Sequence, residues 1–290
     1  MAEIIFHADD YGANKEISEH ILDCCREGAL NSLSVLPNSP HLTACMEMLE
    51  PYRKSAAVSI HCNLAEGPCL ADPAQVPWLV DERGMFSISF FKVLLLSFIG
   101  KRAELKRQIK EEMRAQIVRM LPYVESLRID SHQHYHMIPV VLESILEAAE
   151  ETGREIAFIR IPAEPVRPFL RRISLYRTYR PINLVKNIVL NLLSHMDRNL
   201  LKPYRNKSAV FFGIVLSGCM DLKRVEALLL AFRKIAERKG LPLEVLCHPG
   251  GVSSAADLMD PKNQDCAAFY LSDGRKTEKT MLLKISGRTL

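Results

Sequence analysis

The feature that most constrains the fold of this chain is a regular alternation of short apolar runs with longer helical patterns. The apolar runs have the length of buried strands and cover residues 3–8, 32–36, 57–62, 127–131, 157–161, 210–216 and 243–248. Stretches with apolar residues at three- and four-residue spacing lie between them, at 15–27, 41–50, 101–121, 139–151 and 221–239. The alternation predicts an α/β fold in which helices surround a parallel, barrel-like sheet. The alternation continues along the chain without a break that would mark a domain boundary, so we expect residues 1–290 to form a single domain.

Charge, cysteines and hydropathy exclude several classes of protein. Lys and Arg number 38 against 34 Asp and Glu, a near balance that argues against nucleic acid as a partner. The first residues carry no basic segment typical of a signal peptide, and the eight cysteines form no C-x-x-C pair, so we expect reduced thiols in a cytoplasmic protein. The apolar runs 88–99, 182–193 and 210–216 are too short to span a bilayer.

One region of the chain is strongly basic. Between residues 154 and 207 there are twelve Lys and Arg but only three acidic residues. An exposed insertion, at about 165–207, would explain this charge through arginines that extend into solvent. Alternatively, the region forms a patch for an anionic substrate or for peripheral contact with a membrane surface, aided by the apolar run 182–193.

Polar side chains that could carry chemistry follow several predicted strands. Asp9 and Asp10 come after the first apolar run, His61 ends the third, and the segment 130–136 has histidines at 132, 134 and 136. Parallel α/β folds gather their active sites at such strand ends. One Asp and two His leave positions open on a bound cation, as in a catalytic metal site. One aspartate could instead cap the next helix, and a single histidine could simply be packed.

Two further strand ends carry a candidate acid and a candidate cation. His248 could donate a proton to a departing amine, or hold the Pro-Gly turn that follows it. Arg160 could orient the substrate, or form a salt bridge with Glu164. Four histidines match no pattern, and we interpret them as ordinary residues: His7, His20, His41 and His195. Motifs of serine hydrolases, P-loop proteins and zincins do not occur in the sequence.

The ordered set of these motifs resembles the YdjC/ChbG-type carbohydrate deacetylases. The matching segments are His7-Ala8-Asp9-Asp10-Tyr11-Gly12, His61-Cys62-Asn63-Leu64-Ala65-Glu66-Gly67-Pro68, residues 130–136, Arg160-Ile161-Pro162 and His248-Pro249-Gly250. The resemblance implies an irregular (β/α) barrel that removes an N-acetyl group from an amino sugar with one divalent cation. It implies Asp10, His61 and His132 as metal ligands, Asp9 as general base and His248 as proton donor, with Arg160 and His136 at the substrate.

Other functions fit the same residues. The chain could be a metal-dependent phosphoesterase whose basic region holds an anionic sugar substrate, or a non-catalytic protein that binds carbohydrate or a membrane surface. The ligand types fit either Mg²⁺ or Zn²⁺. The identity of the sugar stays open, as does its attachment to a polymer or a lipid. For the oligomeric state, a homodimer is the default expectation.

Overall fold

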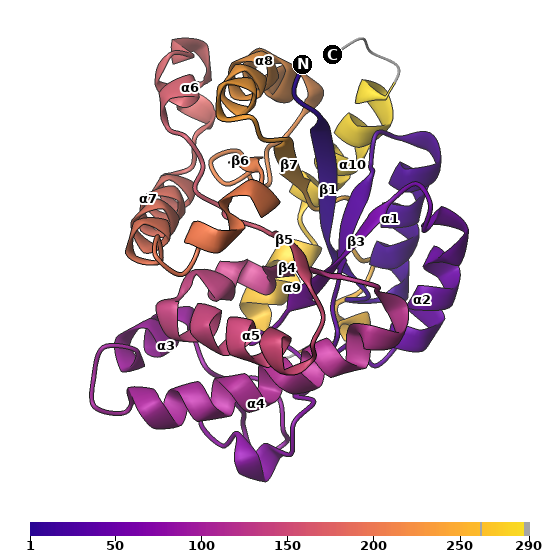
Figure 1. Cartoon of the computed structure of the whole chain (residues 1–290). Helices are drawn as coiled ribbons and strands as arrows, with labels where there is room; N and C mark the ends of the chain where they lie inside the picture. Colours follow the sequence, from indigo (N-terminus) through magenta and orange to yellow (C-terminus); the bar gives the residue numbers. More distant parts are fainter. Residues whose placement is uncertain (262, 287–290) are drawn as a thin grey trace.

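A sheet of seven parallel strands forms the centre of the computed structural model, which describes residues 1–261 and 263–286 (Figure 1). The strands are β1 (Ile4–Tyr11), β2 (Ser32–Val35), β3 (Ala57–Cys62), β4 (Leu127–Ser131), β5 (Ile156–Ile159), β6 (Val210–Phe212) and β7 (Leu243–Cys247). Their order across the sheet is β5-β4-β3-β2-β1-β7-β6, and each neighbouring pair is parallel. The sheet curls into a half-barrel surrounded by helices, which confirms the predicted α/β fold.

Two sets of helices accompany the sheet. Those that surround it are α1 (Lys15–Glu27), α2 (Leu42–Leu49), α4 (Arg102–Met120), α5 (Pro139–Glu151), α8 (Leu222–Lys239) and α10 (Asp273–Ile285). The others lie in the connections after β3, β5 and β7, and they are α3 (Phe90–Leu96), α6 (Arg167–Leu170), α7 (Pro181–Met196) and α9 (Gln264–Tyr270). Short 3₁₀ turns are η1 (Glu50–Tyr52), η2 (Pro73–Gln75), η3 (Leu121–Tyr123), η4 (His132–Met137), η5 (Ile173–Thr178), η6 (Lys202–Lys207) and η7 (Ala255–Asp257). Within the described residues, each helix is too short or too polar to cross a bilayer.

The connection between β1 and α1 shows how the local sequence prepares the strand ends. Asp10 has a positive φ of 72°, and the register between β1 and β2 shifts between Ala8 and Tyr11. Asn14 then caps α1, because its side chain accepts a hydrogen bond from the backbone N–H of Ile17 at 2.8 Å. The capping role that we considered for one of the two aspartates therefore belongs to Asn14.

The core lies on both faces of the sheet. All five residues of β7 are buried, as expected for a parallel strand that is covered on both sides. Helix α1 contributes an apolar stripe that includes Ile17 and Ile21, while polar residues such as Glu19 face solvent. The structure pairs none of the eight cysteines in a disulfide among the described residues.

The predicted strand at 210–216 is wrong in its second half. Only Val210–Phe212 pairs with β7. The backbone N–H groups of Gly213, Ile214 and Val215 instead donate to the carboxylate of Glu164, at 2.7, 3.1 and 2.9 Å. A buried carboxylate needs donors, and these N–H groups leave the sheet to provide them. Glu164 is thus bound to this loop rather than to Arg160, with which we considered a salt bridge.

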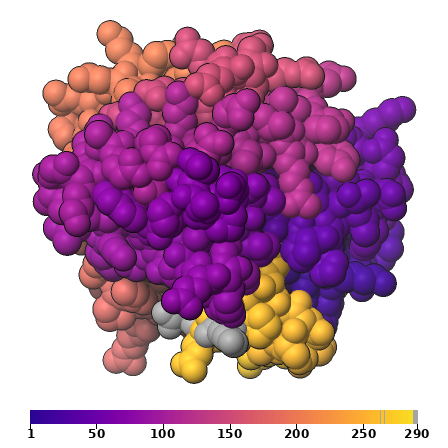
Figure 2. Space-filling view, turned by 90° about the horizontal axis from the view of Figure 1, so that it is seen from below, coloured from indigo at the N-terminus to yellow at the C-terminus, as the bar shows by residue number. Residues whose placement is uncertain are grey.

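Two features of chain connectivity bear on the site. The segment between β5 and β6 contains α6, η5, α7 and η6, covers the predicted insertion at about 165–207, and lies along one side of the molecule (Figure 1). Near the C-terminus, the chain returns to the loop that follows β3, and the two segments lie side by side (Figure 2). The side chain of Asn263 donates to the carbonyl of Ala65 there. Both segments therefore reach the carboxyl edge of the sheet.

Candidate active site

The two aspartates at the end of β1 point to different partners. Arg160 donates from both terminal nitrogens to the two oxygens of Asp9, each at 2.9 Å. Arg275, on α10, donates to Oδ2 of Asp10 at 2.6 Å. Adjacent residues of a regular strand point to opposite faces of the sheet. Asp10 departs from regular strand geometry, because its φ is positive. The result is one carboxylate tied to the end of β5 and one tied to the C-terminal helix.

Arg160 links several carboxylates beneath the strand ends. Besides Asp9, it donates to Glu244 at 2.8 Å and lies 3.3 Å from Oδ2 of Asp130. Burial alone would raise the pKa of Asp9, but Arg160 and His61 outweigh this effect and hold the pKa well below its usual value. Asp9 is therefore ionised at neutral pH.

His61, at the end of β3, is oriented by Asp130 on the neighbouring strand β4. Its Nδ1 lies 2.6 Å from Oδ1 of Asp130, whose other oxygen accepts a hydrogen bond from Ser34 at 2.6 Å. Nε2 of His61 is buried without a hydrogen-bond partner among the described residues, 3.6 Å from Oδ1 of Asp10. Burial would lower the pKa of His61, but Asp9 and Asp130 outweigh it and raise the pKa to about 10. The free nitrogen thus faces a strongly negative environment.

His132 approaches the same oxygen of Asp10 from the end of β4. Its Nδ1 is 3.1 Å from Oδ1 of Asp10, and its Nε2 is 3.3 Å from Oε1 of Glu66. Tyr270 on α9 donates a hydrogen bond to the same carboxylate oxygen of Glu66. The chain turns directly after His132, where Gln133 and His134 have positive φ values of 50° and 59°. The strand therefore stops at this point, and the three histidines of the segment separate.

These side chains fit a divalent cation. The ligand atoms of Asp10, His61 and His132 all lie within 4.8 Å of one another, and all three residues are buried. Each histidine has a carboxylate at its second nitrogen, an arrangement that orients imidazoles at metal sites. The unpartnered Nε2 of His61 is the kind of buried polar atom that a cation would satisfy. The donor set of one carboxylate and two imidazoles suits Zn²⁺ and related metals, and is open enough for a catalytic role.

Two other groups of potential ligands are less suited to a cation. In the group of His7, Asp9 and Asp130, the histidine already contacts Ser32 and Ser34, and both acids contact Arg160. The group of Glu66, His132 and Cys266 shares His132 with the first site, and its Glu66 accepts from Tyr270. Arginine and protein hydrogen bonds thus occupy the positions that a cation would need.

A pocket of about 640 Å³ opens over this centre. Asp9, Asp10 and His132 line its floor together with His134 and His248. Its walls come from the connections after β3, β5 and β7, and include Phe90 and Phe91 of α3, Ile182, Val185 and Val189 of α7, and Phe269 and Tyr270 of α9. The pocket is therefore polar at its base and apolar toward its mouth, a pattern typical of small-molecule sites.

His248 follows β7 and contributes an imidazole to this pocket. Glu278 on α10 accepts a hydrogen bond from the backbone N–H of His248 at 2.6 Å, and the same carboxylate oxygen is 3.6 Å from Nδ1 of the ring. Phe269 packs edge-on against the imidazole, with the ring centroids 5.1 Å apart. The ring is held between a carboxylate and an aromatic side chain, with its edge available to the pocket.

Arg160 and His136 lie behind the pocket rather than on its surface. Both side chains are fully buried. His136 uses Nδ1 toward Ser131 at 2.6 Å and Nε2 toward the carbonyl oxygen of Arg160 at 3.0 Å. Contact of these two residues with a substrate stays a prediction, and the observed partners favour a role in positioning Asp9 and the end of β4.

His7, which we interpreted as an ordinary residue, lies beside the candidate site. Its ring is buried, contacts Ser32 at 2.8 Å, and lies 3.3 Å from Oδ1 of Asp9. The signal was present in the sequence, because His7 precedes Asp9 by two residues and strand residues at this spacing share a face. Arg275 and Glu278 had no such signal, since they lie in a charged helix far along the chain.

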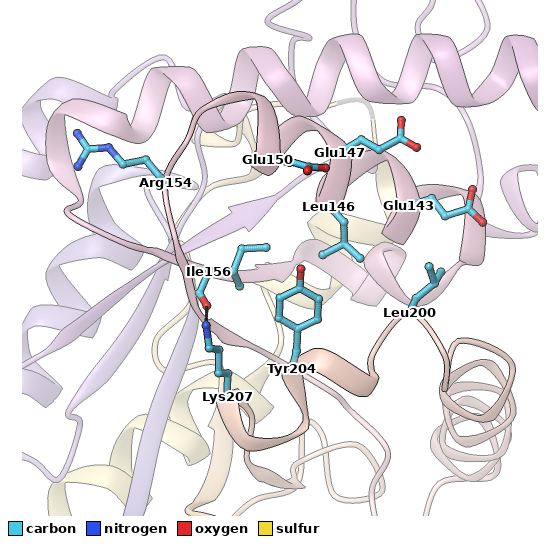
Figure 3. A pocket seen from close by; sticks show the side chains of 9 residues that line it. All are labelled: Glu143, Leu146, Glu147, Glu150, Arg154, Ile156, Leu200, Tyr204 and Lys207. Carbon is cyan, nitrogen blue, oxygen red and sulfur yellow. Dashed lines mark hydrogen bonds between the residues drawn. The ribbon is translucent and has the colours of Figure 1, made fainter.

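A second cavity, of about 450 Å³, lies between α5, the start of β5 and η6 (Figure 3). Its acidic side chains belong to α5, and Glu143 and Glu147 pair with Arg102 and Lys106 of α4, each at 2.6 Å. Lys207 donates to the backbone carbonyl of Ile156 (Figure 3). These charges are already used between neighbouring elements, so this cavity offers no comparable chemistry.

Comparisons with known proteins agree with this architecture. Residues 3–286 match the sequence profile of a family described as YdjC-like protein. A carbohydrate deacetylase of Danio rerio is 26% identical over 166 residues, which cover 56% of this chain and 50% of that protein. A carbohydrate deacetylase of Thermoanaerobacter pseudethanolicus is 28% identical over 152 residues, which cover 52% of this chain and 58% of that protein. The chain thus aligns with about half the length of these curated relatives.

One solved structure shares the fold over nearly the whole chain. It is a proposed cellobiose-phosphate cleavage protein from Enterococcus faecalis. The two structures superpose with a TM-score of 0.65, covering 97% of this chain and 90% of the other. Their sequences are 16% identical, so the similarity shows a common fold and no more.

Proposed function

Because the chain belongs to the YdjC-like protein family, we propose that its buried centre hydrolyses the acetamido group of an N-acetylated amino sugar. Membership of this family confirms the resemblance that the sequence motifs predicted. One observation carries the proposal: Asp10, His61 and His132 come together from three strand ends, with Asp9 beside them. The carbohydrate deacetylases among its relatives support a sugar as the substrate.

We assign the binding of one divalent cation, Mg²⁺ or Zn²⁺, to Asp10, His61 and His132. When bound, such a cation polarises a carbonyl oxygen and lowers the pKa of a water molecule. The residues behind the ligands support this assignment. Asp130 orients His61, Glu66 orients His132, and Arg275 holds the oxygen of Asp10 that faces away from both histidines.

Asp9 is the proposed general base. Arg160 keeps it ionised and fixes both of its oxygens, so that it lies next to the candidate ligands without being one of them. During hydrolysis a water molecule adds its oxygen to the acetyl carbonyl carbon, and Asp9 accepts a proton from that water. A side chain that is held in this way needs little reorganisation when the proton moves.

His248 is the proposed general acid. As the C–N bond of the tetrahedral intermediate breaks, the sugar nitrogen takes a proton from His248, and the products are acetate and the free amino sugar. Glu278 lies 3.6 Å from Nδ1 of His248 and supports the protonated ring, while the pocket exposes the imidazole to a bound substrate. The base and the acid thus come from opposite ends of the chain, Asp9 from β1 and His248 from the end of β7.

Acetate release from a panel of N-acetylated oligosaccharides tests this function. We expect turnover that a chelator abolishes and an added divalent cation restores. Asp9→Asn should lower kcat by about 10²–10⁴-fold while leaving cation binding intact, because it removes the base and its charge beside Arg160 but none of the three candidate ligands. Asp10→Ala should lose both turnover and the cation, which elemental analysis of the purified variant measures.

Three outcomes would overturn the proposal. Full turnover by cation-free Asp10→Ala would show that the three candidate ligands are not needed. Release of phosphate without acetate from a mixed panel would identify a phosphoesterase. Glycan binding that Asp9→Asn does not change, with no turnover of any substrate, would identify a binding protein.

A further inference from the structure

Helix α7 carries apolar residues on two sides: Leu190 and Leu193 are buried in the core, while a second apolar stripe faces solvent. Asn183 and Asn187, four residues apart, are buried against the protein. Ile188 and Leu192, also four residues apart, are 65% and 59% exposed. A surface helix normally turns its apolar stripe toward the core. Ile188 and Leu192 belong to a second stripe that faces outward, so packing against the core does not explain these residues.

Polar partners fix this orientation. Asn187 donates to Oε2 of Glu164 at 2.9 Å, Asn191 donates to the carbonyl of Glu164 at 3.1 Å, and Asn183 donates to the carbonyl of Ser217 at 3.0 Å. Glu164 is itself held by the loop that follows β6. A rotation of α7 that buried its apolar side would leave these groups unsatisfied, at a cost of about 1–3 kcal/mol for each.

Exposed apolar residues also occur on neighbouring elements. Figure 1 shows α6, α7 and α3 along the same side of the molecule. We define the rim face by its exposed apolar residues on α3, α6, η5 and α7 and just after α3, which are Phe91, Leu95, Phe98, Leu170, Ile173, Ile182, Val185, Ile188 and Leu192. Three of these residues, Phe91, Ile182 and Val185, also line the mouth of the active-site pocket. The rim face and the pocket therefore open on the same side.

The charges of the rim face have a single sign. Residues 165–196 contain no Asp or Glu, and their Lys and Arg are all exposed, namely Arg167, Arg171, Arg172, Arg177, Arg180 and Lys186. Residues 85–102 likewise contain Lys92, Lys101 and Arg102 and no acidic residue. Apolar side chains among Lys and Arg are typical of surfaces that lie on anionic bilayers. A second copy of this chain would instead bring cations against cations.

We propose that the rim face docks on an anionic membrane surface, with Ile188 and Leu192 among the side chains that enter the interface. The mouth of the pocket then opens at the lipid headgroups, and only this consequence rests on the proposed deacetylase function. The docking follows from the outer apolar stripe of α7, from the further exposed apolar residues on α3, α6 and η5, and from the absence of acidic residues in the two segments.

Sedimentation of the full chain with vesicles tests the docking without any need for turnover. We expect binding to vesicles of phosphatidylcholine with phosphatidylglycerol, weaker binding to phosphatidylcholine alone, and a loss of binding as salt is raised. Ile188→Asn combined with Leu192→Asn should weaken binding roughly tenfold or more, because two apolar side chains no longer enter the interface. Arg172→Glu combined with Arg177→Glu should weaken binding mainly at low salt.

Val118→Asn, at an exposed apolar position near the C-terminal end of α4, is the matched control and should bind as the parent chain does. None of the four substituted rim positions lines the pocket, so acetate release from a soluble substrate should be unchanged in these variants. This result separates a failure of docking from a failure of the proposed function. Docking is overturned if the parent chain binds no vesicle, or if the rim variants bind as well as Val118→Asn. It is also overturned if the parent chain forms a dimer that the rim variants disperse.

Discussion

The buried centre and the rim face depart from the usual distribution of residues in opposite directions. In the centre, Asp9, Asp10 and Arg160 are ionisable and almost completely buried, although such groups are normally exposed. On α7, Ile188 and Leu192 are apolar and mostly exposed, while asparagines face the protein. The charges of the centre pair with one another inside the chain, whereas the apolar stripe of α7 faces solvent. Ion pairs inside the chain explain why the charges of the centre are buried. The exposed apolar stripe is explained by a partner outside the chain, which we propose to be a membrane surface.

The buried centre and α7 also differ in the interactions that stabilise them. Arg160 serves three acidic residues at once and Arg275 holds Asp10, so the centre depends on buried cations of the chain itself. The orientation of α7 depends on neutral amides and on the buried carboxylate of Glu164. We therefore expect substitutions in the centre to have large effects on stability and substitutions on the rim face to have small ones.

Replacing Arg160 should produce the largest loss of stability. Arg160→Met leaves Asp9, Asp130 and Glu244 buried without their common cation, and we expect the free energy of unfolding to fall by about 3–5 kcal/mol. Urea denaturation followed by circular dichroism measures this change. Lys186→Met, which removes an exposed cation of α7, is the control and should change stability by less than about 0.5 kcal/mol. Equal losses of unfolding free energy in the two variants would contradict the expectation that the centre matters more for stability than the rim face.

Asp197 sharpens the comparison because it is a buried carboxylate, directly after α7, with no paired cation among the described residues. Its Oδ2 has no hydrogen-bond partner among the described residues, and burial, with a smaller effect of Glu143, raises its pKa to about 7. The folded protein thus holds this proton more tightly than the unfolded chain, whose Asp pKa is about 3.9. The contribution of Asp197 to the free energy of unfolding is therefore greatest below about pH 4 and falls as pH rises to about 7.

Asp197→Asn should remove this dependence. Relative to the parent chain, the variant should gain about 2–4 kcal/mol of stability between pH 4 and pH 7. Urea denaturation at several pH values measures the difference, with the exposed Asp257→Asn as control. A stability difference that did not grow with pH over this range would contradict the prediction.

Two substitutions at adjacent positions of α7 should have the smallest effects on stability. The substitution that makes the helix more apolar should be the more destabilising of the two. Asn187→Leu increases apolar character but removes a donor to Glu164, so we expect a loss of about 1–3 kcal/mol. Ile188→Asn makes the helix more polar at an exposed position and should change stability by less than about 0.5 kcal/mol. Thermal unfolding of the two variants side by side compares them. If Ile188→Asn is the more damaging, α7 packs on its apolar side in solution.

Much of the fold was predictable because each strand has a local apolar signature. The runs that became β1, β3, β4 and β7 are short, apolar and followed by a polar residue, and these properties depend on neighbours in the chain. The same local signature placed the aspartates and histidines at strand ends, and the family resemblance implied Asp10, His61 and His132 as ligands. The structure brings the ligand atoms of these three residues within 4.8 Å of one another. The end of β6 was not predictable, because the N–H groups after Phe212 turn toward Glu164, a residue far away in sequence.

The sequence by itself determined which side chains stand at the carboxyl ends of the parallel strands, because strand length and apolar patterning are local properties. Only the tertiary structure decided which charges meet there. Arg275 and Glu278 join the centre from α10 although nothing near them in the sequence distinguishes them from exposed residues. The outward apolar side of α7 was decided in the same way, because asparagines turn inward only where distant groups such as Glu164 offer hydrogen bonds that water would otherwise supply.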